Sequence, residues 1–370
     1  MKKLVLIIIL VTISIGIAYG FNILLTNVTD TPNEPQPKNE IQNENKIDEN
    51  NKNEIKEPQN ETKSEVVASQ YVSYNGWLKV DGTQIKNEKN NSFTLKGISS
   101  HGLQWFPDIL TYNNLKTLKD TWNINVFRIA MYTDENGYIS NKDSIKQKLY
   151  EVADNVINLD MYVVIDWHIL HDNNPNIYKE DAKSFFDEVS NKYKNTPNVI
   201  YEICNEPNGE NVTWDNDVKP YADEIIPIIR KNSPKSLIIV GTPRWCQVLK
   251  PIVQNKLNYD NILYSCHFYA GTHKQELRDE VSFALQNNIP VIISEWGTTD
   301  ASGNGNVDTS ETQKWIEFLN NNNISFINWS FCNKNESSAL ITDAFPVNDL
   351  NASFNDYLSE SGRLVKDLLK

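Results

Sequence analysis

The chain has 370 residues and a net charge of −13 at pH 7. This length allows one large domain or two small ones, and the acidic balance argues against nucleic acid as a partner. Nine Trp, 16 Tyr and 13 Phe supply more flat apolar surface than a core requires, so the composition fits a neutral, ring-shaped ligand.

The N-terminus begins with MKK and continues from Leu4 to Leu25 without a charged residue. Such a segment predicts export, and we expect residues 1–26 to be a signal peptide or an N-terminal membrane anchor. Residues 18–20 (AYG) offer a cleavage site, but a run of this length also suffices to span a bilayer. Either outcome predicts an extracellular protein, secreted or anchored to the outer face of the cytoplasmic membrane through residues 4–25.

Residues 27–68 are rich in Asn, Glu, Lys and Pro and contain few large apolar side chains. They cannot bury enough apolar surface to offset the entropy of ordering, so we predict a disordered polar linker. A tether of this length favours an uncleaved anchor in front of it. Residues 69–370 are then expected to form a single domain.

Eight short apolar runs follow, separated by segments with helical periodicity. Runs this uniformly apolar are typical of strands covered on both faces, as in a parallel sheet. The predicted strands are residues 93–99, 124–131, 162–168, 198–206, 237–242, 262–269, 290–296 and 324–331. Clear helical patterns lie at residues 146–159, 181–193, 221–232 and 311–322. This α/β alternation predicts a (β/α)8 TIM barrel; an open doubly wound sheet is the rival, but no glycine-rich phosphate turn follows the first strand.

Polar and aromatic side chains stand at the ends of these predicted strands. In a barrel, functional groups gather at the C-terminal ends of the strands. The candidates in chain order are His101, Arg128, His168, Asn205, Glu206, Trp245, His267, Tyr269, Glu295, Trp329, Lys334 and Glu336. Each alone has a structural explanation, such as a strand cap or a partner for a core carboxylate. Because polar or aromatic residues follow nearly every predicted strand, we expect them to form a functional site together.

Two carboxylates dominate this set, Glu206 after the fourth strand and Glu295 after the seventh. Strands four and seven are far enough apart around a barrel for these groups to face each other across its mouth. Such a pair suits glycoside hydrolysis, with retention at a separation of about 5 to 5.5 Å and inversion at a wider one.

The motifs NEP at residues 205–207 and SEW at residues 294–296 resemble the two signatures of glycoside hydrolase family 5. The likeness extends over residues 76–363 and is to bacterial endo-β-1,4-glucanases of that family. Its other segments are HGLQW (101–105), NVFRIAMYT (125–133), DWHIL (166–170), HFYAGTH (267–273) and NKNESSA (333–339). The resemblance implies a retaining cellulase that needs no cofactor and no metal and takes a β-1,4-glucan as substrate. We expect a monomer that attacks the chain internally, because no insertion is long enough to roof a tunnel.

By the same resemblance Glu206 is the general acid/base and Glu295 the nucleophile. We expect Arg128 to lower the pKa of Glu295, and the resulting anion to keep Glu206 protonated. Asn205 is expected to direct its amide at the sugar 2-hydroxyl, and Tyr269 to hydrogen-bond the nucleophile.

The remaining candidates are expected to bind or support the substrate. His101, His168 and His267 resemble groups that contact the sugar or hold the catalytic residues, with His267 near the acid/base; histidines bonded only to backbone are the alternative. The aromatic candidates are Trp105, Tyr132, Trp245 and Trp329, and the tryptophans suit sugar stacking, with core packing as the alternative. Lys334 and Glu336 are expected to bind hydroxyls near Trp329.

The four cysteines show no CxxC pattern and are predicted to be buried free thiols. Cys204 and Cys332 depart from the family pattern. Strand alternation predicts that Cys204 points into the barrel with Glu206 while Cys266 points away, so no disulfide is expected between these two cysteines.

Several alternative functions stay open. Within the family they are β-mannanase, xyloglucanase and mixed-linkage glucanase. Outside it they are a metal-dependent barrel hydrolase, since three histidines and two glutamates offer zinc ligands, and a non-catalytic glycan-binding barrel.

Overall fold

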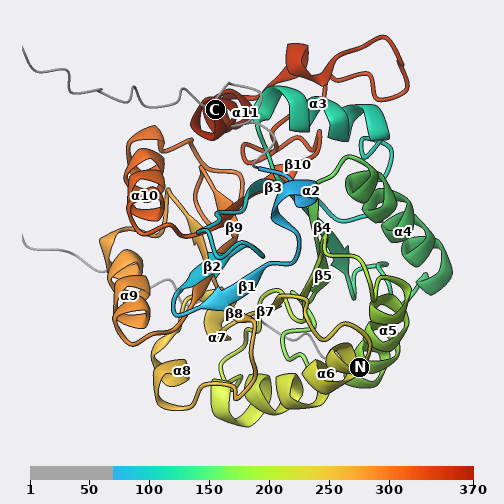
Figure 1. The fold of residues 1–370 in the computed structure, drawn as a ribbon. Helices are drawn as coiled ribbons and strands as arrows, with labels where there is room; N and C mark the ends of the chain where they lie inside the picture. Colours follow the sequence, from blue (N-terminus) through green and yellow to red (C-terminus); the bar gives the residue numbers. More distant parts are fainter. Residues whose placement is uncertain (1–69) are drawn as a thin grey trace, which may run out of the picture. The chain divides into compact units, whose positions relative to one another are not determined.

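The computed structural model describes residues 70–370, and eight parallel strands within them close into a barrel in the order β10-β3-β4-β5-β6-β7-β8-β9 (Figure 1). The strands are β3 (Lys96–Ser100), β4 (Val126–Tyr132), β5 (Tyr162–His168), β6 (Val199–Glu202), β7 (Ile238–Val240), β8 (Ile262–Tyr269), β9 (Val291–Gly297) and β10 (Phe326–Phe331). The predicted (β/α)8 barrel is confirmed, with one strand in each predicted segment. The predictions for residues 1–26 and 27–68 lie outside the described residues.

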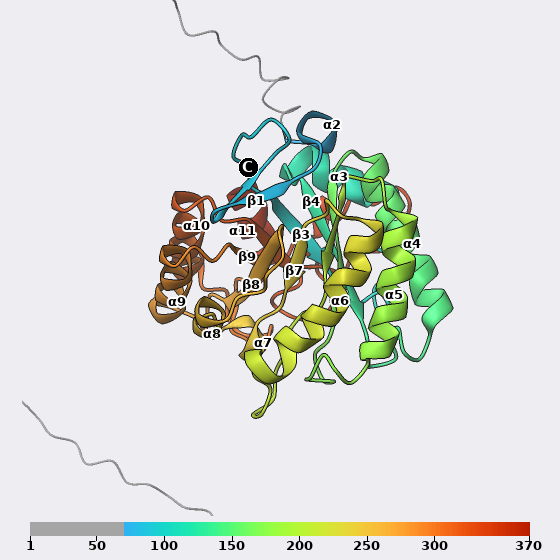
Figure 2. The ribbon, with the colours of Figure 1, turned by 60° about the horizontal axis from the view of Figure 1, so that its bottom comes forward.

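Helices surround the barrel and cover its strands (Figures 1 and 2). The longer helices are α3 (Tyr112–Trp122), α4 (Lys142–Asn158), α5 (Lys179–Lys192), α6 (Lys219–Asn232), α9 (Gln275–Gln286), α10 (Thr309–Asn321) and α11 (Glu360–Leu369). The short elements are α2 (Val72–Asn75), η1 (Trp214–Val218), α7 (Pro243–Cys246), α8 (Lys250–Gln254) and η2 (Phe354–Tyr357). Within residues 70–370, no helix combines the length and the apolar character needed to cross a membrane.

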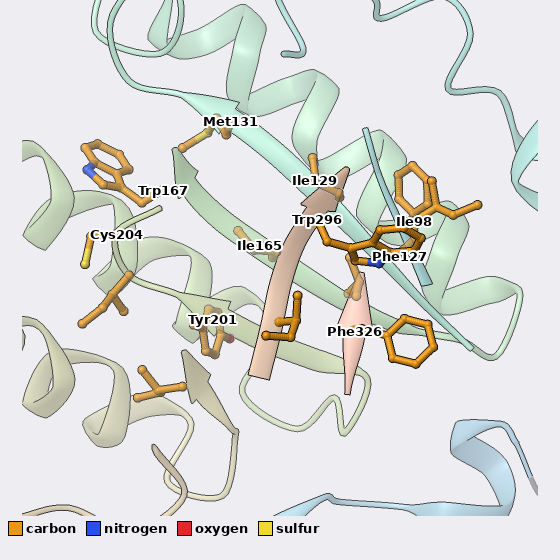
Figure 3. Close-up of a cluster of buried hydrophobic side chains, with 14 of the residues drawn as sticks. Ile98, Phe127, Ile129, Met131, Ile165, Trp167, Tyr201, Cys204, Trp296 and Phe326 are labelled. Carbon is orange, nitrogen blue, oxygen red and sulfur yellow. The ribbon is translucent and has the colours of Figure 1, made fainter. Parts of the chain in front are cut away.

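Side chains alternate along each strand between the barrel interior and the layer beneath the helices. In β4, Phe127 and Ile129 pack in the outer apolar layer, whereas Val126 and Arg128 face the interior. Figure 3 shows this outer layer, with Cys204 among its buried side chains. Apolar residues on both faces of the strands explain why the sequence runs are continuous rather than alternating.

A hairpin closes the end of the barrel where the strands begin. Strands β1 (Lys79–Asp81) and β2 (Gln84–Lys86) pair antiparallel and lie opposite α7 in Figure 2. Ile85 belongs to an interior cluster with Val126 and Val164. The hairpin thus covers this end of the barrel and leaves the other end, where the strands finish, as the place to look for a site.

All four cysteines are buried and free, as predicted. The expected orientation of Cys204 is wrong, because β6 ends at Glu202 and strand alternation does not continue to residue 204. Cys204 packs instead in the outer apolar layer, which also holds Cys266.

Candidate active site

Polar and aromatic side chains line a cavity of about 690 Å³ at the C-terminal ends of the barrel strands. Twelve of the fourteen predicted site residues lie there: His101, Trp105, Tyr132, His168, Glu206, Trp245, His267, Tyr269, Glu295, Trp329, Lys334 and Glu336. The other two, Arg128 and Asn205, are fully buried and hydrogen-bond to Glu295 and His168, respectively. The fold thus brings the whole predicted set together.

Glu295 reaches the cavity because β9 contains a β-bulge. Ser265 on β8 pairs with Ile292 on β9, and His267 pairs with Glu295. The segment of β9 between these two pairs is therefore one residue longer than the segment of β8. A bulge inserts one extra residue and re-aims the side chains around it. Ser294 and Glu295 therefore both hydrogen-bond inside the barrel, where strict alternation would have placed one of them outside.

Glu206 comes from the loop that follows β6. The sequence pattern predicted a strand through residue 206, but the strand ends at Glu202. The side chain of Asn208 donates a hydrogen bond to the backbone carbonyl of Glu206 at 2.8 Å. Oε1 of the Glu206 carboxyl group lies 2.8 Å from Nδ1 of His267. One oxygen of Glu206, one nitrogen of His267 and one oxygen of Glu295 all lie within 4.8 Å of one another.

Arg128 connects the parts of the site. Its Nε donates to Glu202 at 2.7 Å and its Nη1 to Glu295 at 3.1 Å. Its Nη2 lies 3.0 Å from Asp166 and donates to Asn205 at 2.6 Å. Burial alone would lower the pKa of Arg128, but the three carboxylates raise it above the ordinary value. One permanently charged guanidinium therefore fixes Glu295 and Asn205 relative to each other.

The two cavity carboxyl groups are weaker acids than ordinary glutamates. Burial raises the pKa of Glu206 to about 7, with Arg128 opposing the shift and Glu202 adding to it. Burial also raises the pKa of Glu295, and the charge of Glu206 adds to this effect, while His267 and Arg128 oppose it. Arg128 lowers the pKa of Glu295 as expected, but burial and the charge of Glu206 outweigh its effect, so the net shift is upward. Burial, rather than the expected charge of Glu295, is the main cause of the raised pKa of Glu206.

A chain of hydrogen bonds joins Glu206 to Glu202, a further buried carboxylate. Nδ1 of His267 contacts Glu206, and Nε2 of the same ring lies 2.9 Å from the hydroxyl of Ser294. The Ser294 hydroxyl donates to Glu202 at 2.5 Å. Burial lowers the pKa of His267 to about 4, so the ring is neutral at pH 7 and has one donor and one acceptor nitrogen. The chain fixes the orientation of the Glu206 carboxyl group.

The other two predicted histidines are also buried and neutral. His168 places Nδ1 2.6 Å from Asp166 and Nε2 3.3 Å from the amide of Asn205, and burial lowers its pKa well below the ordinary value. His101 accepts the backbone N–H of Gly102 at 2.7 Å, and burial lowers its pKa to about 3. His101 thus has a backbone partner at Nδ1, but its Nε2 lies 4.0 Å from Glu336 and the ring lines the cavity, while His168 orients Asn205. The predicted contact of Asn205 with a sugar hydroxyl stays a prediction.

Aromatic rings form much of the cavity wall. Trp105 and Trp245 expose 43% and 45% of their surface, so core packing does not explain them. Trp329 is only 6% exposed and lies with its ring centroid 4.9 Å from that of His101. Tyr132 contacts Trp105 edge to face at 4.8 Å. Indole faces that are accessible from the cavity suit the apolar faces of sugar rings.

Polar groups stand beside these rings. Nζ of Lys334 lies 2.5 Å from Glu336, which forms an ion pair at the cavity wall. The hydroxyl of Tyr269 donates to Oε1 of Glu295 at 2.9 Å, as expected. Both oxygens of Glu295 are thus held, one by Tyr269 and the other by Arg128.

Comparison with known proteins identifies the family. A model of the cellulase family, glycosyl hydrolase family 5, matches residues 86–335. The chain belongs to glycosyl hydrolase family 5. The resemblance noted in the sequence motifs is thereby confirmed.

Two curated relatives illustrate the similarity to other family 5 proteins. An endoglucanase from Clostridium saccharobutylicum is 52% identical over 270 residues, which cover 73% of this chain and 60% of the relative. Endoglucanase N from Pectobacterium atrosepticum is 46% identical over 300 residues, covering 81% of this chain and 66% of the relative. The chain thus matches about three fifths of the length of the first of these relatives.

Solved structures of family 5 members agree with this fold. The cellulase Cel5C_n superposes with a TM-score of 0.76 at 43% identity, covering 81% of this chain and 93% of that one. The catalytic domain of a Thermobifida fusca endoglucanase, solved in complex with cellotetraose, gives a TM-score of 0.76 at 32% identity, with 80% of this chain and 98% of that one covered.

Within residues 70–370 of this family 5 chain, one group of side chains has the spacing of metal ligands, namely Glu206, His267 and Glu295. Their donor atoms are already engaged with one another or with Arg128 and Tyr269. A cation at this point would have to displace an arginine bound to one of its ligands. The arrangement therefore does not fit a resident metal ion.

Sequence reading missed the buried acids beneath the cavity, Asp166 and Glu202, together with Ser294. A signal for the two acids was present, since each interrupts an apolar strand that was predicted to be buried on both faces. Ser294 begins the SEW motif, but the motif assigned it no role, because its direction depends on the bulge in β9. Residues of the cavity rim were missed as well: Glu135, Leu170, His171, Gln247, His273 and residues 301–303.

Proposed function

We propose that this chain is an endo-acting, retaining glycoside hydrolase that cleaves internal β-1,4-glucosidic bonds of cellulose or related β-glucans. The observation that carries the proposal is that one carboxyl oxygen of Glu206 lies within 4.8 Å of one carboxyl oxygen of Glu295. Carboxyl groups about 5 to 5.5 Å apart are typical of retaining enzymes, whereas inverting enzymes separate them by about 6.5 to 9.5 Å. The endoglucanase names of the relatives support the substrate class.

In the first step the carboxylate of Glu295 attacks the anomeric carbon. An ester bond forms between Glu295 and the sugar, and the glycosidic bond breaks. Glu206 gives its proton to the departing oxygen. Arg128 and Tyr269 hold the two oxygens of Glu295, which fixes its direction of attack.

In the second step water attacks the same carbon. Glu206, now ionised, accepts a proton from this water while the ester bond to Glu295 breaks. The acid and base roles fall to one group because its proton affinity changes with the charge of its neighbour. When Glu295 is an ester it carries no charge, so the pKa of Glu206 falls. The configuration of the anomeric carbon is inverted twice and hence retained.

The cavity wall supports binding of a glucan chain along its length. Trp105 and Trp245 present exposed indole faces, and Trp329 presents a more enclosed one. Stacking against sugar rings buries apolar surface on both partners. Lys334 and Glu336 supply a donor and acceptors for hydroxyl groups. Exposed indole surfaces of this kind suit cleavage at internal bonds of a glucan chain.

We further propose that the protein acts outside the cell as a monomer. The basis for the extracellular location is the uncharged run at residues 4–25 together with the polar segment that follows it. Both the secreted and the anchored form would bring the barrel to an external polysaccharide.

Product analysis tests the proposed activity directly. Carboxymethyl-cellulose is expected to be shortened internally and faster than lichenan, xyloglucan or mannan, and NMR of the nascent product is expected to show the β-anomer first. A parallel reaction with EDTA should run at the same rate. Faster cleavage of mannan or xyloglucan would assign the chain that activity instead. An α-anomer as the first product would exclude double displacement. Loss of activity with EDTA would favour the metal-dependent alternative.

The pH dependence tests the roles of the two glutamates. On cellotetraose, kcat/KM is expected to fall as the pH rises through about 7, because Glu206 must be protonated and its pKa is about 7. The acid limb should lie above pH 4.5, because Glu295 must be ionised and its pKa is raised from that value. With 2,4-dinitrophenyl β-cellobioside, whose leaving group needs no proton, the basic limb should disappear. A basic limb that is identical for both substrates would contradict the acid role of Glu206.

A further inference from the structure

The turn after β7 has an unusual backbone. Arg244, Trp245 and Cys246 are consecutive and have φ angles of 56°, 54° and 60°. This left-handed conformation is rare for residues other than glycine, because the β-carbon crowds the neighbouring carbonyl oxygen. Three such residues in a row persist only where surrounding contacts hold them.

The contacts that hold this turn go to both sides of Glu206. The backbone N–H of Trp245 donates to the carbonyl of Pro207 at 3.2 Å. The thiol of Cys246 donates to the carbonyl of Asn205 at 2.9 Å. The turn therefore holds the residue before and the residue after Glu206.

Close packing supports the same connection. A β-carbon on Gly241 would lie 2.2 Å from the carbonyl oxygen of Cys204 and 2.5 Å from that of Asn205, so only glycine allows this approach. Cys246 has no exposed surface, and burial raises the pKa of its thiol well above the ordinary value. The sulfur thus keeps its proton and remains a donor.

The side chain of Trp245 faces the same cavity as Glu206. A strained backbone therefore connects an exposed sugar-stacking surface to the loop that carries the proposed acid. We propose that Cys246 is a positioning residue for proton donation by Glu206: its thiol holds the carbonyl of Asn205 and so sets the position of the Glu206 carboxyl group relative to a sugar on Trp245. This inference rests on the proposed acid role of Glu206.

The test compares two substrates in Cys246→Gly, Cys246→Ser and the unchanged protein. Cys246→Gly removes the donor and suits a positive φ angle, so the variant is expected to fold. Its kcat/KM on cellotetraose should fall at least tenfold, while that on 2,4-dinitrophenyl β-cellobioside should stay within twofold. Cys246→Ser keeps a donor and should restore most of the activity on cellotetraose. As a control, Arg244→Gly relieves the neighbouring backbone without touching the thiol and should leave both values unchanged.

Two outcomes would overturn the inference. Equal losses on both substrates would show that Cys246 only maintains structure, and unchanged kcat/KM on cellotetraose in Cys246→Gly would show that the thiol does not position the acid. Failure of the proposed function itself would be seen separately, as absence of hydrolysis of both substrates by the unchanged protein.

Discussion

Replacing Glu295 with Gln is expected to lower kcat on cellotetraose by about 10⁴-fold or more, since removing a covalent nucleophile costs up to about 10⁶-fold in other hydrolases. The amide keeps the size of the side chain but cannot form the sugar ester. Cellotetraose binding should be nearly unchanged, because the tryptophans and Lys334 remain. Steady-state kinetics and calorimetric titration measure the two effects.

The control for this variant is Glu311→Gln. Glu311 is also a buried carboxylate paired with an arginine, Arg278 at 2.6 Å, but it lies on α10 outside the cavity. The Glu311→Gln variant should have a kcat near that of the unchanged protein. If Glu295→Gln kept its rate within tenfold, Glu295 would not be the nucleophile, and if the unchanged protein bound cellotetraose without cleaving it, the non-catalytic alternative would hold.

Replacing Arg128 with Met is expected to lower the free energy of unfolding by about 3 to 5 kcal/mol, as for other buried ion pairs that lose one partner. Asp166, Glu202 and Glu295 would remain buried without their shared cation. Their pKa values would rise further, so the folded state would favour their protonated forms. The loss of stability should therefore increase as the pH rises from 5 to 8. Urea unfolding at several pH values measures it.

Arg278→Met provides the matched control for Arg128→Met. Arg278 is buried and pairs with the single carboxylate of Glu311. We expect a smaller loss of stability with little dependence on pH and no change in kcat. Equal losses for the two variants, or a loss of less than about 1 kcal/mol for Arg128→Met, would contradict the view that Arg128 balances three buried charges.

Much of the barrel could be predicted because its strands and helices have distinct periods. Eight apolar runs gave eight strands, and helical patterns such as residues 146–159 fell within α4 apart from one residue at its end. The ends of strands were harder to predict. The pattern ran to residue 206, yet the regular strand stops at Glu202, and beyond it Ile203 and Cys204 pack in the outer apolar layer with only single backbone hydrogen bonds to the neighbouring segments.

The electrostatics of the site could be predicted only in part. The sequence indicated that Arg128 and the two glutamates meet, and they do. It did not show how deeply Glu295 is buried, nor that Asp166 and Glu202 share the same cation, so the net rise in the pKa of Glu295 was not predicted. A pKa depends on burial and on every nearby charge, and these are set by residues that are distant along the chain.

Local periodicity, and the rule that parallel strands end at one edge, were enough to predict the barrel, its parallel strands and the residues that gather at its mouth. Three features became visible only in the folded chain: the bulge that turns Ser294 and Glu295 into the barrel, the sharing of Arg128, and the left-handed turn that holds Glu206. Each of these depends on contacts between segments that are distant along the chain, and such contacts leave no periodic trace in the sequence.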